Sequence, residues 1–187
     1  MSTPSANSLK GRIYLAIMAR LTEVLKYDED EIQKDIPSLR WVDKNMGQFN
    51  RPEMHDSVPL PGILISFPGT GWKSLSQNYQ QGVMRIRIEV GYENYSSSFD
   101  GSPDVESAIR FFEFNEAVHQ ALQGWSCPGM TSMERVADEE DDDHGAMIVT
   151  ALEYETTIED RSASKLRSTT KVERNIIPTF QSPQGTD

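Results

Sequence analysis

Hydrophobic and polar side chains alternate strictly along residues 83–92, VMRIRIEVGY. Position 84 and every second position after it is apolar, whereas Arg85, Arg87 and Glu89 occupy the positions between them. A period of two is typical of a β-strand with one buried and one solvated face. The pattern therefore predicts a sheet that is covered on one side only, and it argues against a fully buried parallel sheet.

A different period, with apolar residues three and four positions apart, marks a helix near the N-terminus. Asn7 or Ser8 is suited to cap this helix, which is predicted to run to about Lys26. Its apolar stripe includes Ile13, Ile17 and Leu21. Such an amphipathic helix is expected to pack on the sheet.

A second helix is predicted between Ser102, as the cap, and Gly124, as the stop, with Pro103 at the first helical position. Its apolar side chains fall on two neighbouring faces. One face holds Val105, Ala108, Ile109, Phe112 and His119, and the other holds Phe111, Phe114, Val118 and Leu122. So broad an apolar surface predicts burial against the sheet and a further element.

Four other segments have the composition of strands, namely residues 39–43, 62–67, 133–137 and 146–158. Pro68-Gly69-Thr70-Gly71 predicts a turn, and the polar stretch 72–82 predicts an exposed loop. The order of elements indicates an α+β fold. It is expected to have a mixed or antiparallel sheet of about four to five strands with amphipathic helices packed on one face.

The length of 187 residues fits a single domain. We expect this domain to span residues 8–160, between a flexible arm (1–7) and a polar C-terminal tail (161–187). The tail carries Lys165, Arg167, Lys171 and Arg174, and it is expected to become ordered on a partner.

The formal net charge of −11 argues against a stable grip on nucleic acid, because most of the surface repels phosphates. High solubility is the simplest reason for this acidity. The single cysteine, Cys127, fits a reducing compartment. No stretch is apolar enough for a membrane span, and the N-terminus lacks the features of a secretory signal.

The most acidic feature is a run of six carboxylates: Asp138, Glu139, Glu140, Asp141, Asp142 and Asp143. The spacing of a calcium-binding loop is not met, so a solvated loop at a hairpin tip is the favoured interpretation. Opportunistic cation binding and a dedicated metal site are the alternatives. A solvated acidic loop would also repel DNA at close range.

Catalytic chemistry has little support in the sequence. His55, His119 and His144 lack the spacing of zinc ligands, and His119 is expected to be a satisfied histidine at the edge of the core. No nucleophile, phosphate-binding or dinucleotide motif is present. We therefore expect a protein that is not an enzyme and that has neither cofactor nor metal.

Three residues are candidates for an interface with a partner or another subunit. Arg85 and Arg87 either keep one sheet face solvated or meet an acidic neighbour, such as another copy of the chain. Trp72, in the predicted loop, is a plausible interface anchor.

Several local patterns resemble the tail-terminator and tail-completion (neck) proteins of long-tailed bacteriophages. The resemblance covers about residues 9–160. It rests on the N-terminal helix, Trp41 with the turn Asn45-Met46-Gly47-Gln48, and the strand after Pro61. It also includes the Gln81-Gly82 entry to the alternating strand, the helix ending near Leu122, and the closing Leu152-Glu153-Tyr154-Glu155-Thr156.

This resemblance implies a structural virion protein of the head–tail junction that caps the tail tube as a ring, typically of six copies. The implied partners are the chain itself, the tail-tube protein and the head connector, and the location is the virion, with the host cytoplasm during assembly. DNA would pass through transiently, and the acidic run Asp138 to Asp143 would face its channel. The acidic hairpin and the tail after Asp160 have no counterpart in the family pattern.

Three alternatives stay open at the level of sequence. The first is another neck or head-completion protein. The second is a monomeric acidic protein-binding module with a groove near Trp72. The third is a metal-dependent hydrolase that uses an acidic cluster.

Overall fold

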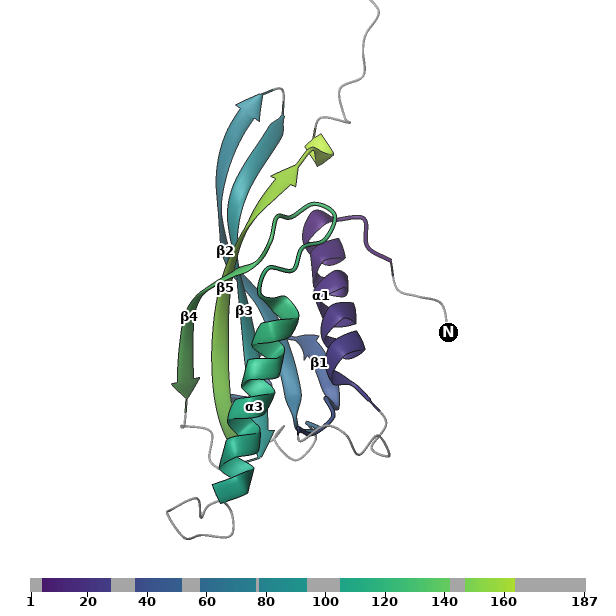
Figure 1. The fold of residues 1–187 in the computed structure, drawn as a ribbon. Helices are drawn as coiled ribbons and strands as arrows, with labels where there is room; N and C mark the ends of the chain where they lie inside the picture. The colour runs from purple at the N-terminus through teal and green to yellow at the C-terminus, as the bar shows by residue number, and fades with distance from the viewer. Residues whose placement is uncertain are drawn as a thin grey trace, which may run out of the picture.

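A computed structural model describes residues 5–27, 36–51, 58–76, 78–93, 105–141 and 147–163. These residues form a five-stranded mixed sheet with two helices on one of its faces (Figure 1). The predicted α+β fold class is confirmed. Some predictions lie outside the described residues: the first four residues of the N-terminal arm, the helix start at Ser102-Pro103, Asp142 and Asp143, and the tail from position 164.

The elements in chain order are α1 (Leu9–Leu25), β1 (Trp41–Lys44), β2 (Gly62–Ser76), β3 (Tyr79–Glu93), α3 (Val105–Leu122), β4 (Glu134–Asp141) and β5 (Met147–Asp160). The strand order is β1-β2-β3-β5-β4. Strand β1 pairs in parallel with β2, and the other neighbours are antiparallel. Among the described strands, β1 and β4 are therefore the two edges of the sheet.

The predicted start of α1 at Ser8 and the predicted stop of α3 at Gly124 are confirmed. Ser8 precedes α1 in an extended conformation, and its hydroxyl accepts a hydrogen bond from the Gly11 backbone N–H at 3.2 Å. Gly124 follows α3 with φ of 73°, the left-handed conformation that glycine adopts without strain. The helices are also joined to each other, because Arg20 Nε donates to the Ala121 carbonyl at 3.1 Å.

The main core lies between the helices and the sheet. The alternation in β3 has the predicted effect, since Met84, Ile86, Ile88 and Val90 are fully buried on the helix side. Helix α1 contributes its buried stripe Ile13, Ile17, Leu21 and Leu25, and α3 contributes Phe111, Phe114, Val118 and Leu122.

The prediction that only one side of the sheet is covered is wrong at one end of the sheet. A second apolar cluster of Phe49, Leu64, Met147 and Val149 lies on the face opposite the helices. Gly91 makes room for it, because a Cβ at this position would lie 2.6 Å from Cζ of Phe49. The segment before β2 therefore covers part of the second face.

The turn predicted at Pro68-Gly69-Thr70-Gly71 and the loop predicted at 72–82 are also wrong. Strand β2 continues to Ser76, and β3 already begins at Tyr79. The register shifts between Ser66 and Gly69, which places Pro68 in an irregularity where its missing N–H does not interrupt the ladder. Pairing with β3 along its whole length outweighs the local turn preference.

Candidate functional site

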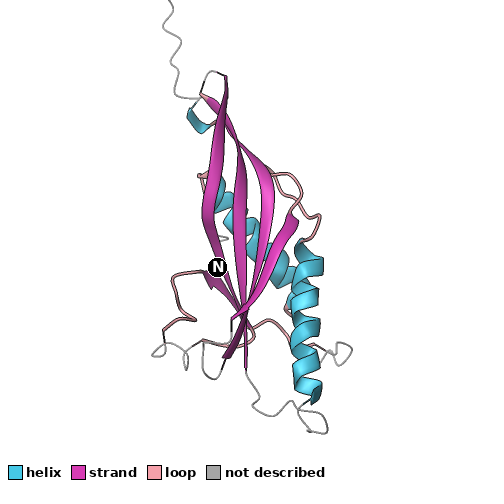
Figure 2. Ribbon diagram, turned by 90° about the vertical axis from the view of Figure 1, so that its left-hand side faces the viewer, coloured by secondary structure: helices cyan, strands magenta, loops and turns pink. Residues whose placement is uncertain are grey.

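The first candidate surface is the outer part of the β2–β3 hairpin. Strands β2 and β3 continue past the ends of both helices and form a projecting arm (Figures 1 and 2). We use "arm" for residues 69–76 and 79–83. Three large apolar side chains of the arm are exposed: Trp72 by 41%, Leu75 by 44% and Val83 by 48%. An exposed apolar set on a projecting hairpin is typical of a contact surface.

Trp72 is held in place by the backbone of the opposite strand. It pairs with Gly82 across the hairpin, and a Cβ on Gly82 would lie 2.9 Å from Cε3 of Trp72. The absence of a side chain at Gly82 therefore gives the indole ring its position. Trp72 was expected in a loop, but the structure places it in a strand, which fixes the direction of its ring more firmly.

The end of β5 supports the arm from the side. Its residues pair with β3 as far as Asp160 opposite Gln80. Just beyond this pair, the Arg161 guanidinium lies 4.5 Å from the ring centroid of Tyr79, and Arg161 Nη2 lies 3.4 Å from the Tyr79 hydroxyl. The arm is thus three-stranded almost to its tip, and three strands hold a projecting shape better than two.

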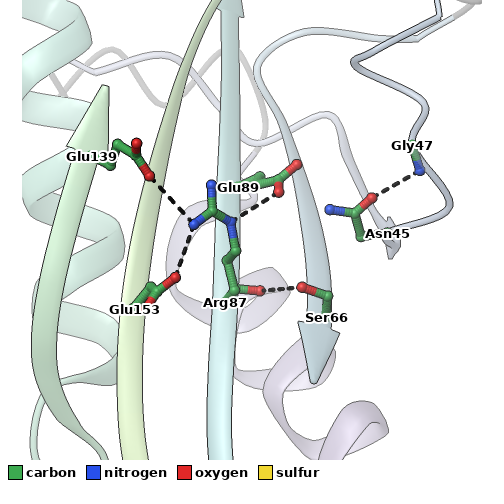
Figure 3. Close-up of polar contacts among 7 residues, drawn as sticks. All are labelled: Asn45, Gly47, Ser66, Arg87, Glu89, Glu139 and Glu153. Carbon is green, nitrogen blue, oxygen red and sulfur yellow. Dashed lines mark hydrogen bonds and ion pairs between the residues drawn. The ribbon is translucent and has the colours of Figure 1, made fainter. Parts of the chain in front are cut away.

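Arg87 is the centre of an ionic network on the face opposite the helices (Figure 3). Its Nε donates to Glu89 at 3.1 Å, and its Nη1 donates to Glu153 at 2.9 Å. Glu139 of β4 lies 3.6 Å from the same Nη1 atom. Burial by itself lowers the pKa of Arg87, but the hydrogen bonds to Glu153 and Glu89 outweigh this effect and raise it. The network joins three adjacent strands, β3, β5 and β4.

The three predicted interface residues do not form one patch. Arg85 donates to Glu155 at 2.9 Å and shares the open sheet face with Arg87. Trp72 lies on the other face, because it pairs with Gly82, whose neighbour Met84 faces the helices. Both arginines already have carboxylate partners within the chain. Their role in an interface stays a prediction.

The acidic run is not a loop in its described part. Asp138 to Asp141 belong to the edge strand β4, whose residues are all exposed. The carboxylates alternate between the two faces of the sheet. Asp138 and Glu140 pair with Leu152 and Thr150 of the helix-covered face, whereas Glu139 and Asp141 pair with residues of the open face. Pairing with β5 overrides the low strand preference of acidic residues.

A groove that sequence analysis did not predict lies between α3 and β4. Its volume is about 380 Å³. Four carboxylates and one guanidinium line it, namely those of Glu113, Glu116, Asp138, Glu140 and Arg135. Glu139 also borders the groove, but its carboxylate faces Arg87 on the open face. Phe112 also lines the groove and is 59% exposed, and Ile109, one turn earlier, is 52% exposed. The prediction that the whole apolar surface of this helix is buried is therefore wrong for these two residues.

One polar atom in the wall of the groove lacks a protein partner. Asn115 Nδ2 donates to Thr150 Oγ1 at 3.1 Å. Its Oδ1 is buried and accepts no hydrogen bond from the described residues. A buried acceptor without a donor is costly, but this atom has almost no accessible surface and is therefore not open to a partner in the groove.

The remaining candidate residues, His119 and Cys127, lie in environments that fit a structural role. His119 Nδ1 lies 3.3 Å from the Tyr154 hydroxyl, which confirms the prediction of a satisfied histidine at the core boundary. Burial raises the pKa of the Cys127 thiol, so the thiolate is disfavoured there. The described residues contain no group of three or more His, Cys, Asp or Glu side chains arranged to hold a metal ion. None of the described helices has the length and apolarity that a membrane crossing requires.

Comparison with known proteins finds similarity to solved structures but no matching family model or curated protein sequence. The fold is similar to a chain in a solved structure described as "Virion of native gene transfer agent (GTA) particle", with a TM-score of 0.44 and 14% identical residues. The match covers 83% of this chain and 100% of that chain. A similarity of this size does not establish a shared function.

Proposed function

We propose that this chain is a structural subunit of a phage-type virion, which assembles as a ring at the head–tail junction and ends the tail tube. The projecting β2–β3 arm with its exposed Trp72, Leu75 and Val83 is the observation that carries the proposal. The sequence resemblance to tail terminators supplies the class of assembly. No catalytic role is part of the proposal.

The shape of the molecule suits contacts between unlike surfaces of neighbouring copies. The arm projects from one end of the two-layer body (Figure 2). An arm of this kind contacts a different surface of the next copy, and such head-to-tail contacts form a ring when the rotation between copies closes. Trp72 faces the helix side of the arm and Val83 faces the other side, so a neighbouring surface that encloses the arm would bury apolar area on both faces and be stabilised mainly by that burial. We expect six copies, as the resemblance implies.

Strand β4, which carries the acidic residues, also has a role in this proposal. The described carboxylates of Asp138 to Asp143 alternate between the two faces of the sheet. The hypothesis that they line a DNA channel must therefore be stated for each face separately. The open-face side chains Glu139 and Asp141 are the described carboxylates that we propose to face the channel. A negative lining would let DNA pass without adhering, since it repels phosphates.

Disruption of the gene in its source phage tests the function directly. Electron microscopy of the lysate should show overlong, unattached tail tubes beside normal DNA-filled heads. Tails of normal length with leaking heads would instead indicate a head-completion protein. Intact particles would refute a virion role and favour the binding-module or enzyme alternatives.

Purified protein tests the contact that the proposal requires. We expect the chain to form a closed oligomer in size-exclusion chromatography with light scattering, and the pair Trp72→Ser and Val83→Ser to shift it at least ten-fold toward monomer. Met46→Ser is the matched control, because Met46 is also apolar and 62% exposed but lies in the turn after β1. Thermal melting of each variant separates loss of assembly from loss of folding. Equal loss of assembly in the control would show that the arm has no special role.

A further inference from the structure

The groove between α3 and β4 combines three features that point to a docked peptide segment. The outer edge of β4 has no neighbour among the described strands, so its outward N–H and C=O groups are available to an added strand. Phe112 and Ile109 expose apolar area along α3. The lining of the groove is acidic, with the carboxylates of Glu113, Glu116, Asp138 and Glu140. None of these features is explained by packing within the described part of the chain.

The charge of the groove defines the chemistry of its occupant. The four carboxylates and one guanidinium on the helix side of the sheet give its lining a formal charge of −3, because the carboxylate of Glu139 faces Arg87 on the open face. Five of the eight side chains of β4 are acidic, so two β4 edges repel each other and do not pair. A basic extended segment is therefore the complementary partner.

The chain itself contains such a segment beyond its last described residue. Residues 165–174, KLRSTTKVER, carry four basic side chains and one acidic one, a net charge of +3 in a protein of net charge −11. Lys165, Arg167 and Lys171 stand at odd positions, so an extended segment presents them on one side. Thr169, Thr170 and Val172 are β-branched residues that favour strands.

The position of Ala163 favours docking on the groove of another copy, because Lys165 and Arg167 do not reach the groove of their own copy. The last described residues lie at the arm end of β5, whereas the groove lies beside Thr150 and Leu152. Eight residues separate Leu152 from the end of β5 at Asp160. At a rise of about 3.3 Å per residue, this is about 26 Å. Lys165 is two residues beyond Ala163 and reaches only about 7 Å from it, so the whole basic segment does not fit its own groove.

We propose that residues 165–174 of one copy dock as an added strand along β4 of a second copy, with their basic side chains over the groove carboxylates. This inference rests on the proposed ring, and it names a second contact between neighbours besides the arm. The docked strand extends the sheet beside β4, and its helix-side side chains lie next to Asp138, Glu140 and Phe112. Because attraction between charges carries much of this contact, it weakens as salt rises.

A charge exchange in the full chain tests the inference. The groove variant carries Asp138→Lys and Glu140→Lys, and the tail variant carries Lys165→Glu and Lys171→Glu. We expect each variant alone to assemble at least ten-fold more weakly than the native chain in 50 mM salt. An equimolar mixture of the two should recover assembly, because each tail then meets a groove of opposite charge on the other variant. Glu23→Lys with Glu106→Lys is the matched control, since both residues are exposed helix positions that do not line the groove.

Each outcome of this experiment decides between explanations. Native assembly by both variants would overturn the docking proposal and leave the ring proposal intact. A third outcome is that assembly recovers in a chain that carries all four changes but does not recover in the mixture of the two variants. This would show that the segment docks on its own copy, and would overturn the contact between copies. A native chain that is monomeric at every concentration would refute the ring and this contact together. Circular dichroism spectra and melting temperatures close to those of the control ensure that weak assembly does not reflect misfolding.

Discussion

Helices α1 and α3 pack side by side on the same face of the sheet, yet they differ in how completely the monomer buries them (Figure 1). In α1 the apolar stripe is buried, and no large apolar side chain of this helix is exposed. In α3, Phe111 and Phe114 are buried, while Ile109 and Phe112 are more than half exposed. The chain therefore covers the apolar side of α1 and leaves two large apolar side chains of α3 uncovered, which fits the proposed docking of a partner segment beside α3.

The side of α3 that is left open is also the acidic side. It faces β4 across the groove, whereas α1 lies toward β1. An exposed apolar strip beside carboxylates is a poor site for packing against the protein's own core. The same combination suits a contact with a basic, partly apolar segment from outside.

The sharpest test of this contrast compares two phenylalanines of α3. Phe114→Ala should lower the free energy of unfolding by about 3–5 kcal/mol, because Phe114 is fully buried and its loss leaves a cavity. Phe112→Ala should change it by less than about 0.5 kcal/mol, because Phe112 is exposed. Urea denaturation of the monomeric state measures both. A large effect of Phe112→Ala would mean that the monomer itself buries this ring.

Helix α1 offers the next largest effect. Ile17→Ala should cost about 2–5 kcal/mol in the same urea experiment, since Ile17 is fully buried against the sheet. Glu23→Ala, at a position on the same helix whose side chain is 76% exposed, should have an effect within about 0.5 kcal/mol. Similar losses at the two positions would contradict the amphipathic packing of α1.

The contact of α3 with β5 predicts a smaller effect that depends on pH. Tyr154→Phe removes the hydroxyl near His119 Nδ1 and should cost about 1 kcal/mol at neutral pH. Burial raises the pKa of Tyr154 above its ordinary value of 10.0. Above pH 10 the unfolded chain loses this proton while the folded chain keeps it, so stability falls as pH rises.

Unfolding curves between pH 7 and pH 11 would measure the contribution of Tyr154. The decline above pH 10 should be shallower in Tyr154→Phe than in the native chain, although other tyrosines with raised pKa values, such as Tyr92, still contribute. An unchanged slope would show that Tyr154 is not the buried group that resists ionisation.

The smallest effect concerns the start of α1. Ser8→Ala removes the hydroxyl that accepts from the Gly11 N–H, and it should lower stability by about 1 kcal/mol. Ser8→Asp should keep most of this stability, because its carboxylate also accepts at the helix N-terminus. Thermal melting resolves the two, and equal melting temperatures for Ala and native Ser would refute the capping role.

The features that could be predicted from sequence have a short-range physical origin. The helix near the N-terminus follows from its apolar spacing and from Ser8, and the buried face of β3 follows from the alternation at 83–92. The stop at Gly124 follows from the conformational freedom of glycine. In each case the deciding interaction spans only a few residues.

The candidate surfaces depend on contacts between segments that are distant in sequence. Trp72 was identified as an exposed anchor, but the arm that presents it exists because β2 pairs with β3 through and beyond Pro68. The groove escaped prediction because Phe112 looks like a core residue in a helical pattern. Its exposure is decided by β4, more than twenty residues later in the chain.

The amino-acid sequence by itself determined the α+β composition, the face that α1 and the central strand bury, and the acidic character of the molecule. Tertiary structure alone decided the length of the arm, the conversion of Asp138 to Asp141 from an expected loop into an edge strand, and the open side of α3. The period of apolar side chains over a few residues is enough to predict which face of a helix or strand is buried. Strand pairing, in contrast, depends on hydrogen-bond partners from distant segments, and these partners can outweigh the local preferences of proline, glycine and aspartate.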